Sequence, residues 1–280
     1  MLKRIVFIVF CALFYLIVSA IFAEFSRADD YTISSNSTST NGGNTINGSD
    51  SLTLSTGVTI TTSSGNEGID ASGESNTITQ SGNISTSGTS AYGIRLQDNS
   101  NILDVLGTII TNGVQAYGIY LQSSDNNTIT QSGKVTTQNH TSRLYMIKNS
   151  DSNDITQSGD LESTGVKWSH CYYLDNADSN TITQTGNCKT AGSSARSHGY
   201  FFDDVSGDNS GSDGNTIIQK GNITLTENTN KAYYCEEGTN NSITQSGTIT
   251  TSGTDGHGYH FKENCDSNTI TLSGSISVSG

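Results

Sequence analysis

The sequence predicts an all-β protein, a right-handed parallel β-helix of about eight or nine three-strand coils. One phrase, an Asn followed two places later by an apolar residue and usually by Gln-Ser-Gly, recurs at intervals of 25 to 35 residues. Each interval also contains short segments in which polar and apolar residues alternate. A fixed period of this size is typical of a solenoid, in which one unit stacks on copies of itself. The phrase begins at Asn76, Asn101, Asn127, Asn153, Asn180, Asn215, Asn241 and Asn268.

The first 28 residues have the pattern of a secretory signal peptide, and we expect a signal helix over residues 1–28 that is cleaved on export. A positively charged start is followed by a nearly continuous apolar run over residues 5–22, and Ala28, or else Ala23, ends a stretch suited to cleavage. The alternative is an uncleaved membrane anchor, because the run is near the lower length limit for crossing a bilayer.

The repeats are expected over residues 51–280, after a polar segment over residues 29–50 whose first part, residues 29–43, is expected to fray. Residues 76–100 illustrate one repeat. Three alternating segments in it are predicted strands, and Ser-Gly pairs between them are turn residues. No stretch has apolar residues at helical spacing, so each repeat should form one triangular coil of three strands. The three segments are residues 77–79, 83–86 and 92–96.

Stacked coils should align the apolar side chains into inward-facing columns, and the Asn residues that open each phrase should form a ladder of side-chain amides. Tyr200 and Tyr233 face inward by parity. Cys188 takes an apolar position of the second column, so we interpret it as a small buried hydrophobe. Export permits disulfides, but the spacing of the cysteines does not name a pair. The first column is Ile78, Leu103, Ile129, Ile155, Ile182, Ile217, Ile243 and Ile270, and the second is Ile84, Ile109, Val135, Leu161, Cys188, Ile223, Ile249 and Ile276.

The phrase Asn-Thr-Ile-Thr-Gln-Ser-Gly, with Ile-Ser-Thr-Ser-Gly and Ala-Tyr-Gly-Ile after it, resembles the passenger repeats of bacterial autotransporters over residues 44–280. The resemblance implies export to the Gram-negative cell surface, association with the outer membrane or secretion, and cell-surface or extracellular ligands. The sequence departs from the family pattern at Ser279-Gly280, which fall inside a repeat with no barrel-forming strands after them. A truncated product would stay in the periplasm. Such passengers range from adhesins to hydrolases, so the resemblance implies no single activity.

The leading functional hypothesis is a non-enzymatic adhesin or structural stalk, because no phosphate loop, nucleophile elbow or metalloprotease motif is present. A net charge of −13 disfavours nucleic acid as a partner. The alternative is a polysaccharide-acting hydrolase or lyase. Its carboxylates would follow the third strands of consecutive coils, roughly 5–10 Å apart, and calcium could bind the same acids. It would also need aromatic platforms, for which parity leaves only Tyr234. The candidate acids are Asp175, Asp203, Asp204, Glu236 and Glu237.

A histidine column and the last alternating segment carry two weaker predictions. His170 and His198 lie in a column just before the third strand and could share a metal, but Arg143 and Lys231 in the same column favour a corner exposed to solvent. The alternating residues 275–278 have no cap, which predicts end-to-end self-association.

Overall fold

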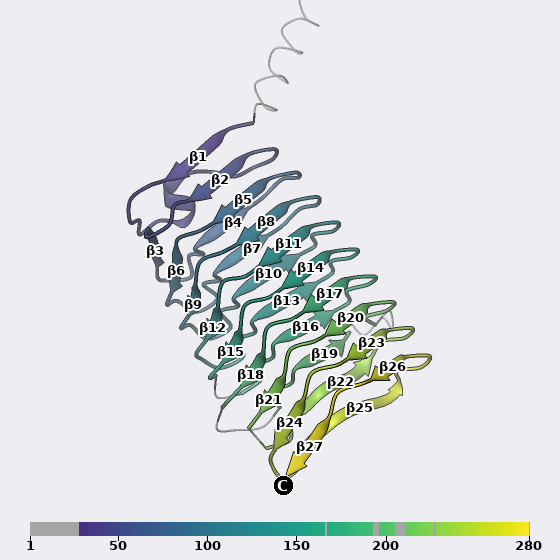
Figure 1. Ribbon diagram of the computed structural model, residues 1–280. Coiled ribbons are helices and arrows are strands. Elements are labelled where there is room, and N and C mark those ends of the chain that lie inside the picture. The colour runs from purple at the N-terminus through teal and green to yellow at the C-terminus, as the bar shows by residue number, and fades with distance from the viewer. Residues whose placement is uncertain (1–27, 166, 193–195, 205–210, 227, 280) are drawn as a thin grey trace, which may run out of the picture.

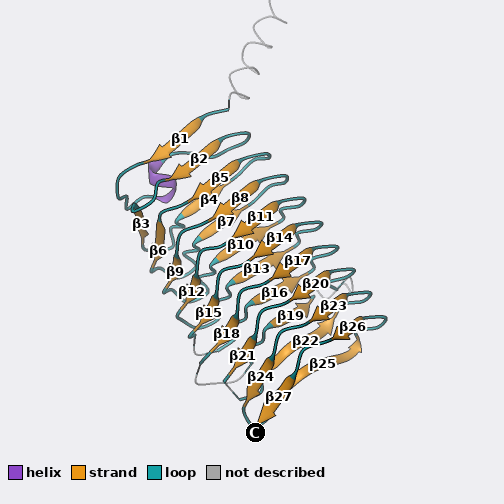
Figure 2. Ribbon diagram, viewed as in Figure 1, coloured by secondary structure: helices purple, strands orange, loops and turns teal. Residues whose placement is uncertain are grey.

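The computed structural model describes residues 28–165, 167–192, 196–204, 211–226 and 228–279, which form a parallel β-solenoid of about eight turns (Figure 1). Three sheets run along the solenoid, and the described part contains one short 3₁₀ helix, η1 (Thr40–Gly43), near its N-terminal end (Figure 2). The predicted all-β coil architecture is confirmed. The predicted signal helix lies outside the described residues. No helix within the described ranges is long and apolar enough to cross a membrane.

Each coil contributes one strand to each sheet, except at the N-terminal end. Sheet A contains β1 (Asp30–Ile33), β2 (Ser51–Leu54), β5 (Thr77–Gln80), β8 (Ile102–Val105), β11 (Thr128–Gln131), β14 (Asp154–Gln157), β17 (Thr181–Gln184), β20 (Thr216–Gln219), β23 (Ser242–Gln245) and β26 (Thr269–Leu272). Sheet B contains β3 (Thr59–Thr62), β6 (Asn83–Thr86), β9 (Ile109–Thr111), β12 (Val135–Thr137), β15 (Leu161–Ser163), β18 (Cys188–Thr190), β21 (Ile223–Leu225), β24 (Ile249–Ser252) and β27 (Ile276–Ser279). Sheet C contains β4 (Ile69–Ala71), β7 (Ile94–Leu96), β10 (Ile119–Gln122), β13 (Tyr145–Lys148), β16 (Tyr172–Asp175), β19 (Tyr200–Asp203), β22 (Lys231–Glu237) and β25 (His257–Asn264).

The predicted Asn ladder is present in the core. Asn153 donates from Nδ2 to Oδ1 of Asn180 in the next coil (2.9 Å), and the same Oδ1 accepts the backbone N–H of Asn153 (2.9 Å). Asn127 makes the same pair of bonds to Asn153. These side chains are almost completely buried, so each amide satisfies polar groups that would otherwise be costly to bury.

The Gln and Gly of the repeated phrase have roles that the sequence reading did not assign. Gln131 is fully buried and donates from Nε2 to the carbonyl of Gly133 (2.8 Å). A Cβ at Gly133 would lie 1.8 Å from the carbonyl oxygen of Gly107 in the preceding coil, so only glycine fits there. The Gly therefore marks a close approach of two stacked backbones as well as a turn.

A stack of buried tyrosines runs through the core on the inner face of sheet C, as parity predicted for Tyr200 and Tyr233. Neighbouring rings along the stack Tyr145, Tyr172, Tyr200 and Tyr233 have centroids 4.8–5.0 Å apart. The Tyr172 hydroxyl donates to Oε1 of Gln184 (2.5 Å), so the stack is joined to the Gln corner. Such offset stacks add about 0.5–1.5 kcal/mol per pair beyond burial.

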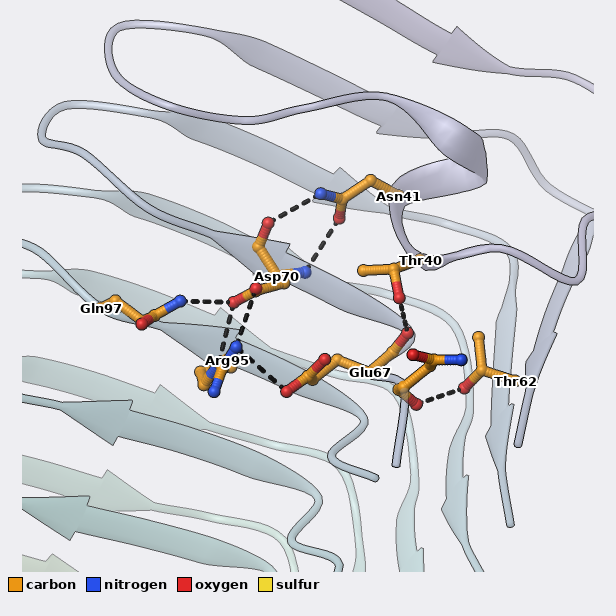
Figure 3. Close-up of polar contacts among 8 residues, drawn as sticks. Thr40, Asn41, Thr62, Glu67, Asp70, Arg95 and Gln97 are labelled. Carbon is orange, nitrogen blue, oxygen red and sulfur yellow. Dashed lines mark hydrogen bonds and ion pairs between the residues drawn. The ribbon is translucent and has the colours of Figure 1, made fainter. Parts of the chain in front are cut away.

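The N-terminal segment covers the first coil, so the expectation that residues 29–43 fray was wrong. β1 pairs in parallel with β2, and the side chain of Asn41 exchanges two hydrogen bonds with the backbone of Asp70 in β4 (2.7 and 2.9 Å; Figure 3). Arg95 and Gln97 hold the Asp70 carboxylate on the same face (2.8–2.9 Å). The amide of Asn41 supplies the bonds that a further strand would make, which is why a polar segment can satisfy this sheet edge.

Two disulfides join the four cysteines that follow the signal segment. Cys188 is fully buried, as expected, but it is bonded to Cys171 of the preceding coil rather than packed as a simple hydrophobe. Cys235 in β22 is bonded to Cys265, which follows β25 in the next coil. The pairing depends on which positions meet across the interior of the coils, and the spacing alone did not reveal it.

Candidate functional site

The outward face of sheet C contains a pocket of about 770 Å³ over β16 to β25. Residues of these strands form its floor, and residues from the segments that precede β13, β16, β19, β22 and β25 form one side. The Phe, Tyr and Trp side chains that line it are Trp168, Tyr173, Phe201 and Tyr234. Its charged side chains are Arg143, Arg196, Lys231, Lys262, Asp203, Glu236 and Asp255.

The register of sheet C aligns three of the rings. Tyr173 pairs with Phe201 and Phe201 with Tyr234, and the ring centroids are 4.9 Å apart in both pairs. Tyr173 and Phe201 are nearly buried, whereas Tyr234 is half-buried. Parity in the sequence assigned only Tyr234 to this face. The missed signal is the pair or triplet of successive aromatic residues in β16, β19 and β22, which is typical of strands covered on both faces.

The structure brings two of the five predicted acids into the pocket and separates the others from it. Asp203 and Glu236 line the pocket. Asp175 is 2% exposed and its carboxylate is paired with Lys148 (2.8 Å), and Asp204 is also buried. Glu237 lies in a separate hollow of about 230 Å³. Successive residues of a strand point to opposite faces, which is why neighbouring acids in the sequence do not share one site.

Asp203 is held in place by two hydrogen bonds. The Tyr173 hydroxyl donates to its Oδ2 (2.5 Å), and the backbone N–H of Asp204 donates to its Oδ1 (3.0 Å). Burial raises the pKa of Asp203, with a smaller contribution from the nearby Glu236 carboxylate, while the bond from Tyr173 opposes the increase. Glu236 itself forms an ion pair with Lys262 across the strands.

His170 and His198 are buried, so the expected exposed corner was wrong at these positions. Their side chains are 0% and 3% exposed, and their rings stack with centroids 5.1 Å apart. Nδ1 of His170 accepts the backbone N–H of His198 (2.9 Å), and Nδ1 of His198 accepts that of Lys231 (3.1 Å). Burial lowers the pKa of His198 to about 3. In the residues that the structure describes, no three or more His, Cys, Asp or Glu side chains are grouped to hold a metal ion.

The cations of the pocket fall into two classes. Lys231 is paired with Asp255 (2.8 Å), as Lys262 is with Glu236. Two arginines lie over aromatic rings, and Lys262 does so as well, with its Nζ 5.6 Å from the Tyr234 centroid. Cζ of Arg143 is 4.0 Å from the centroid of Tyr173, and Cζ of Arg196 is 5.0 Å from the Trp168 ring.

Rings that expose a face, next to fixed donors and acceptors, are suited to a ligand with both apolar C–H surfaces and hydroxyl groups. Comparison with protein-family models, curated proteins and solved structures found no match. The pocket and the fold are therefore the basis for a functional assignment.

Proposed function

We propose that this protein is an exported cell-surface β-solenoid without catalytic activity, an adhesin or stalk of the autotransporter-passenger type, whose sheet C pocket binds a saccharide. The observation that carries the proposal is the aromatic pocket itself. Tyr234 and Trp168 offer accessible ring surface, and charged side chains surround them. Pyranose rings stack on aromatic faces through their C–H groups and use their hydroxyls for hydrogen bonds, which matches this combination.

The disulfides support export. Disulfides persist in oxidising compartments outside the cytoplasm, and the bonds of Cys171 with Cys188 and of Cys235 with Cys265 staple the coils that form the pocket. The signal-like residues 1–28 and the resemblance of the repeats to autotransporter passengers support the same compartment. Mass spectrometry of the expressed protein tests the signal peptide: cleavage after Ala28 or Ala23 supports it, and an intact Met1 on membrane-bound material favours an uncleaved anchor instead.

The ladder of buried amides supports the role of a stalk. Each coil is bonded to the next through Asn side chains as well as through three sheets, so the solenoid resists bending between coils. A stiff rod of this kind can present a pocket at a distance from the surface that anchors it.

Saccharide binding is tested with the intrinsic fluorescence of Trp168, the only tryptophan in the chain. A panel of neutral and anionic oligosaccharides should include members that change its emission with saturation. Tyr234→Ala should weaken binding about fivefold, because a stacking contact is worth about 1 kcal/mol. Tyr92→Ala is the matched control, since Tyr92 stacks on Tyr117 on the same face but outside the pocket. A panel with no binding member would contradict the proposal.

One observation favours a second candidate, a polysaccharide-acting hydrolase or lyase. Asp203 has a raised pKa and lies near a second carboxylate, Glu236, which is the arrangement that a general acid requires. We rank it second because Asp203 and Glu236 are both committed to protein partners, Tyr173 and Lys262. Release of reducing ends or unsaturated products that disappears in Asp203→Asn, with binding retained, would reverse this order.

A further inference from the structure

We infer that the pocket on sheet C takes a carboxylate-bearing saccharide, and that Arg143 and Arg196 recognise its charge. This inference rests on the proposed saccharide pocket and names the chemistry of its ligand. The observation behind it is an imbalance of charge. The chain has a net charge of −13, yet the pocket contains two arginines that have no carboxylate partner within the part of the chain that the structure describes.

The other charges of the pocket are largely matched. Lys231 is paired with Asp255, and Lys262 with Glu236. Asp203 is bonded to the Tyr173 hydroxyl rather than to a cation. His198 accepts a backbone N–H at Nδ1 and is buried, so it adds no charge to the pocket at neutral pH.

The two arginines are placed to bind an anion. A guanidinium stacked on a ring keeps its N–H groups at the edge, where they can donate to a carboxylate in a bidentate manner. Arg143 lies over Tyr173. Its Nη1 donates to the Tyr117 hydroxyl (2.8 Å), while its buried Nε has no hydrogen-bond partner among the described residues. Arg196 lies over Trp168 in the same way and is exposed.

The row of rings fits an extended sugar chain better than a single small anion. Arg143 lies two residues before β13, and Arg196 is on the segment before β19, two coils further along. Arg143 lies over a ring of the following coil and Arg196 over a ring of the preceding coil, so both guanidiniums lie against the coil that contains β16. The rings of Tyr173, Phe201 and Tyr234 extend from this coil along the solenoid axis. An extended oligosaccharide with carboxylates on its sugar units would contact the rings and both arginines together.

The test compares two oligosaccharides that differ only in charge: cello-oligosaccharides, and the same oligomers with each primary alcohol oxidised to a carboxylate. Calorimetry on the mature protein should give about tenfold or tighter binding for the carboxylated form, since a hydrogen bond to a charged group is worth about 1.5–3 kcal/mol. This preference should shrink as salt is raised. Arg196→Gln and Arg143→Gln should each remove most of the preference, and Arg143→Lys should restore it only in part.

Lys220→Gln is the matched control, because Lys220 is exposed and does not line the pocket, so it removes one positive charge elsewhere. Unchanged thermal unfolding of Arg196→Gln shows that a loss of binding is not a loss of fold. Equal binding of both oligomers, unaffected by the arginine variants, would overturn the inference and leave the saccharide pocket standing. Binding of neither oligomer would overturn both. A preference for dextran sulfate over the carboxylated oligomer would overturn the carboxylate assignment.

Discussion

Nδ1 of His170 accepts a hydrogen bond from the backbone N–H of His198, one coil further along the solenoid (2.9 Å). This bond requires an unprotonated Nδ1, and both rings are buried. The histidines therefore link the stacking of coils to pH.

The first prediction is that stability falls as pH decreases below about 6.5. The pKa of His198 is lowered to about 3 in the folded protein, and that of His170 is lowered well below its usual value of 6.5, in both cases mainly by burial. Between about pH 6.5 and pH 3 these histidines are protonated in the unfolded chain but not in the folded chain. Their contribution to stability is therefore fully present above pH 6.5 and is lost towards pH 3. Each histidine should contribute a slope of about 1.4 kcal/mol per pH unit in that window.

Denaturant unfolding between pH 7.5 and 4.5 measures this slope. Comparing variants separates the contribution of the two histidines from that of the other titratable groups. His198→Asn should flatten the dependence. His140→Asn is the control, because His140 is exposed and its variant should keep the slope. A wild-type profile no steeper than that of His198→Asn would contradict the prediction.

The second prediction concerns the Asn ladder. Asn153→Ala removes the acceptor for both the backbone N–H and Nδ2 of Asn127, and it leaves Oδ1 of Asn180 with fewer donors. Unpaired buried groups of this kind should lower the free energy of unfolding by about 2–4 kcal/mol. Asn83→Ala at an exposed position, where the side chain accepts only a 3.4 Å bond, should cost less than about 0.5 kcal/mol. Equal losses in urea titrations would show that the ladder adds no special stability.

The third prediction is that the bond between Cys171 and Cys188 forms in protein purified without reductant and stabilises it. Peptide mapping without reductant should recover these two cysteines as one linked species, separate from Cys235 linked to Cys265. The free energy of unfolding of the double variant Cys171→Ala with Cys188→Ala should be about 2–4 kcal/mol lower than that of the oxidised protein. Alkylation of both thiols in folded, non-reduced protein would refute the pairing.

The fourth prediction is that a chain of residues 28–280 self-associates through β26 and β27. These strands expose apolar side chains, with Leu272 43% and Val278 51% exposed, and their outer edges are unpaired among the described residues. Sedimentation velocity should show species larger than a monomer, and their fraction should fall as the protein is diluted. Leu272→Lys with Val278→Lys should give a monomer, whereas Leu106→Lys, at an equally exposed apolar position in the middle of the solenoid, should not. A monomeric wild type at all concentrations would exclude this contact.

The sequence by itself determined the positions that repeat from coil to coil. The Asn ladder, the two Ile-rich columns and the inward parity of Tyr200 could be predicted, because equivalent residues of stacked coils meet only their own counterparts and the period alone gives their neighbours. The prediction failed for the N-terminal segment, where Asn41 replaces a strand through its side chain and leaves no repeat to recognise.

Only the tertiary structure decided which residues form the pocket and which cysteines are paired. His198 is buried because its ring packs against those of His170, Phe201 and Tyr234. Asp203 lies beside Tyr173 because β19 and β16 are neighbours in sheet C. The disulfide likewise joins Cys171, just before β16, to Cys188 in β18 of the next coil. Such contacts link non-equivalent positions, so they depend on loop paths and on the closure of the triangle. A periodic sequence predicts which equivalent residues stack on one another in successive coils. It says little about which non-equivalent residues come into contact.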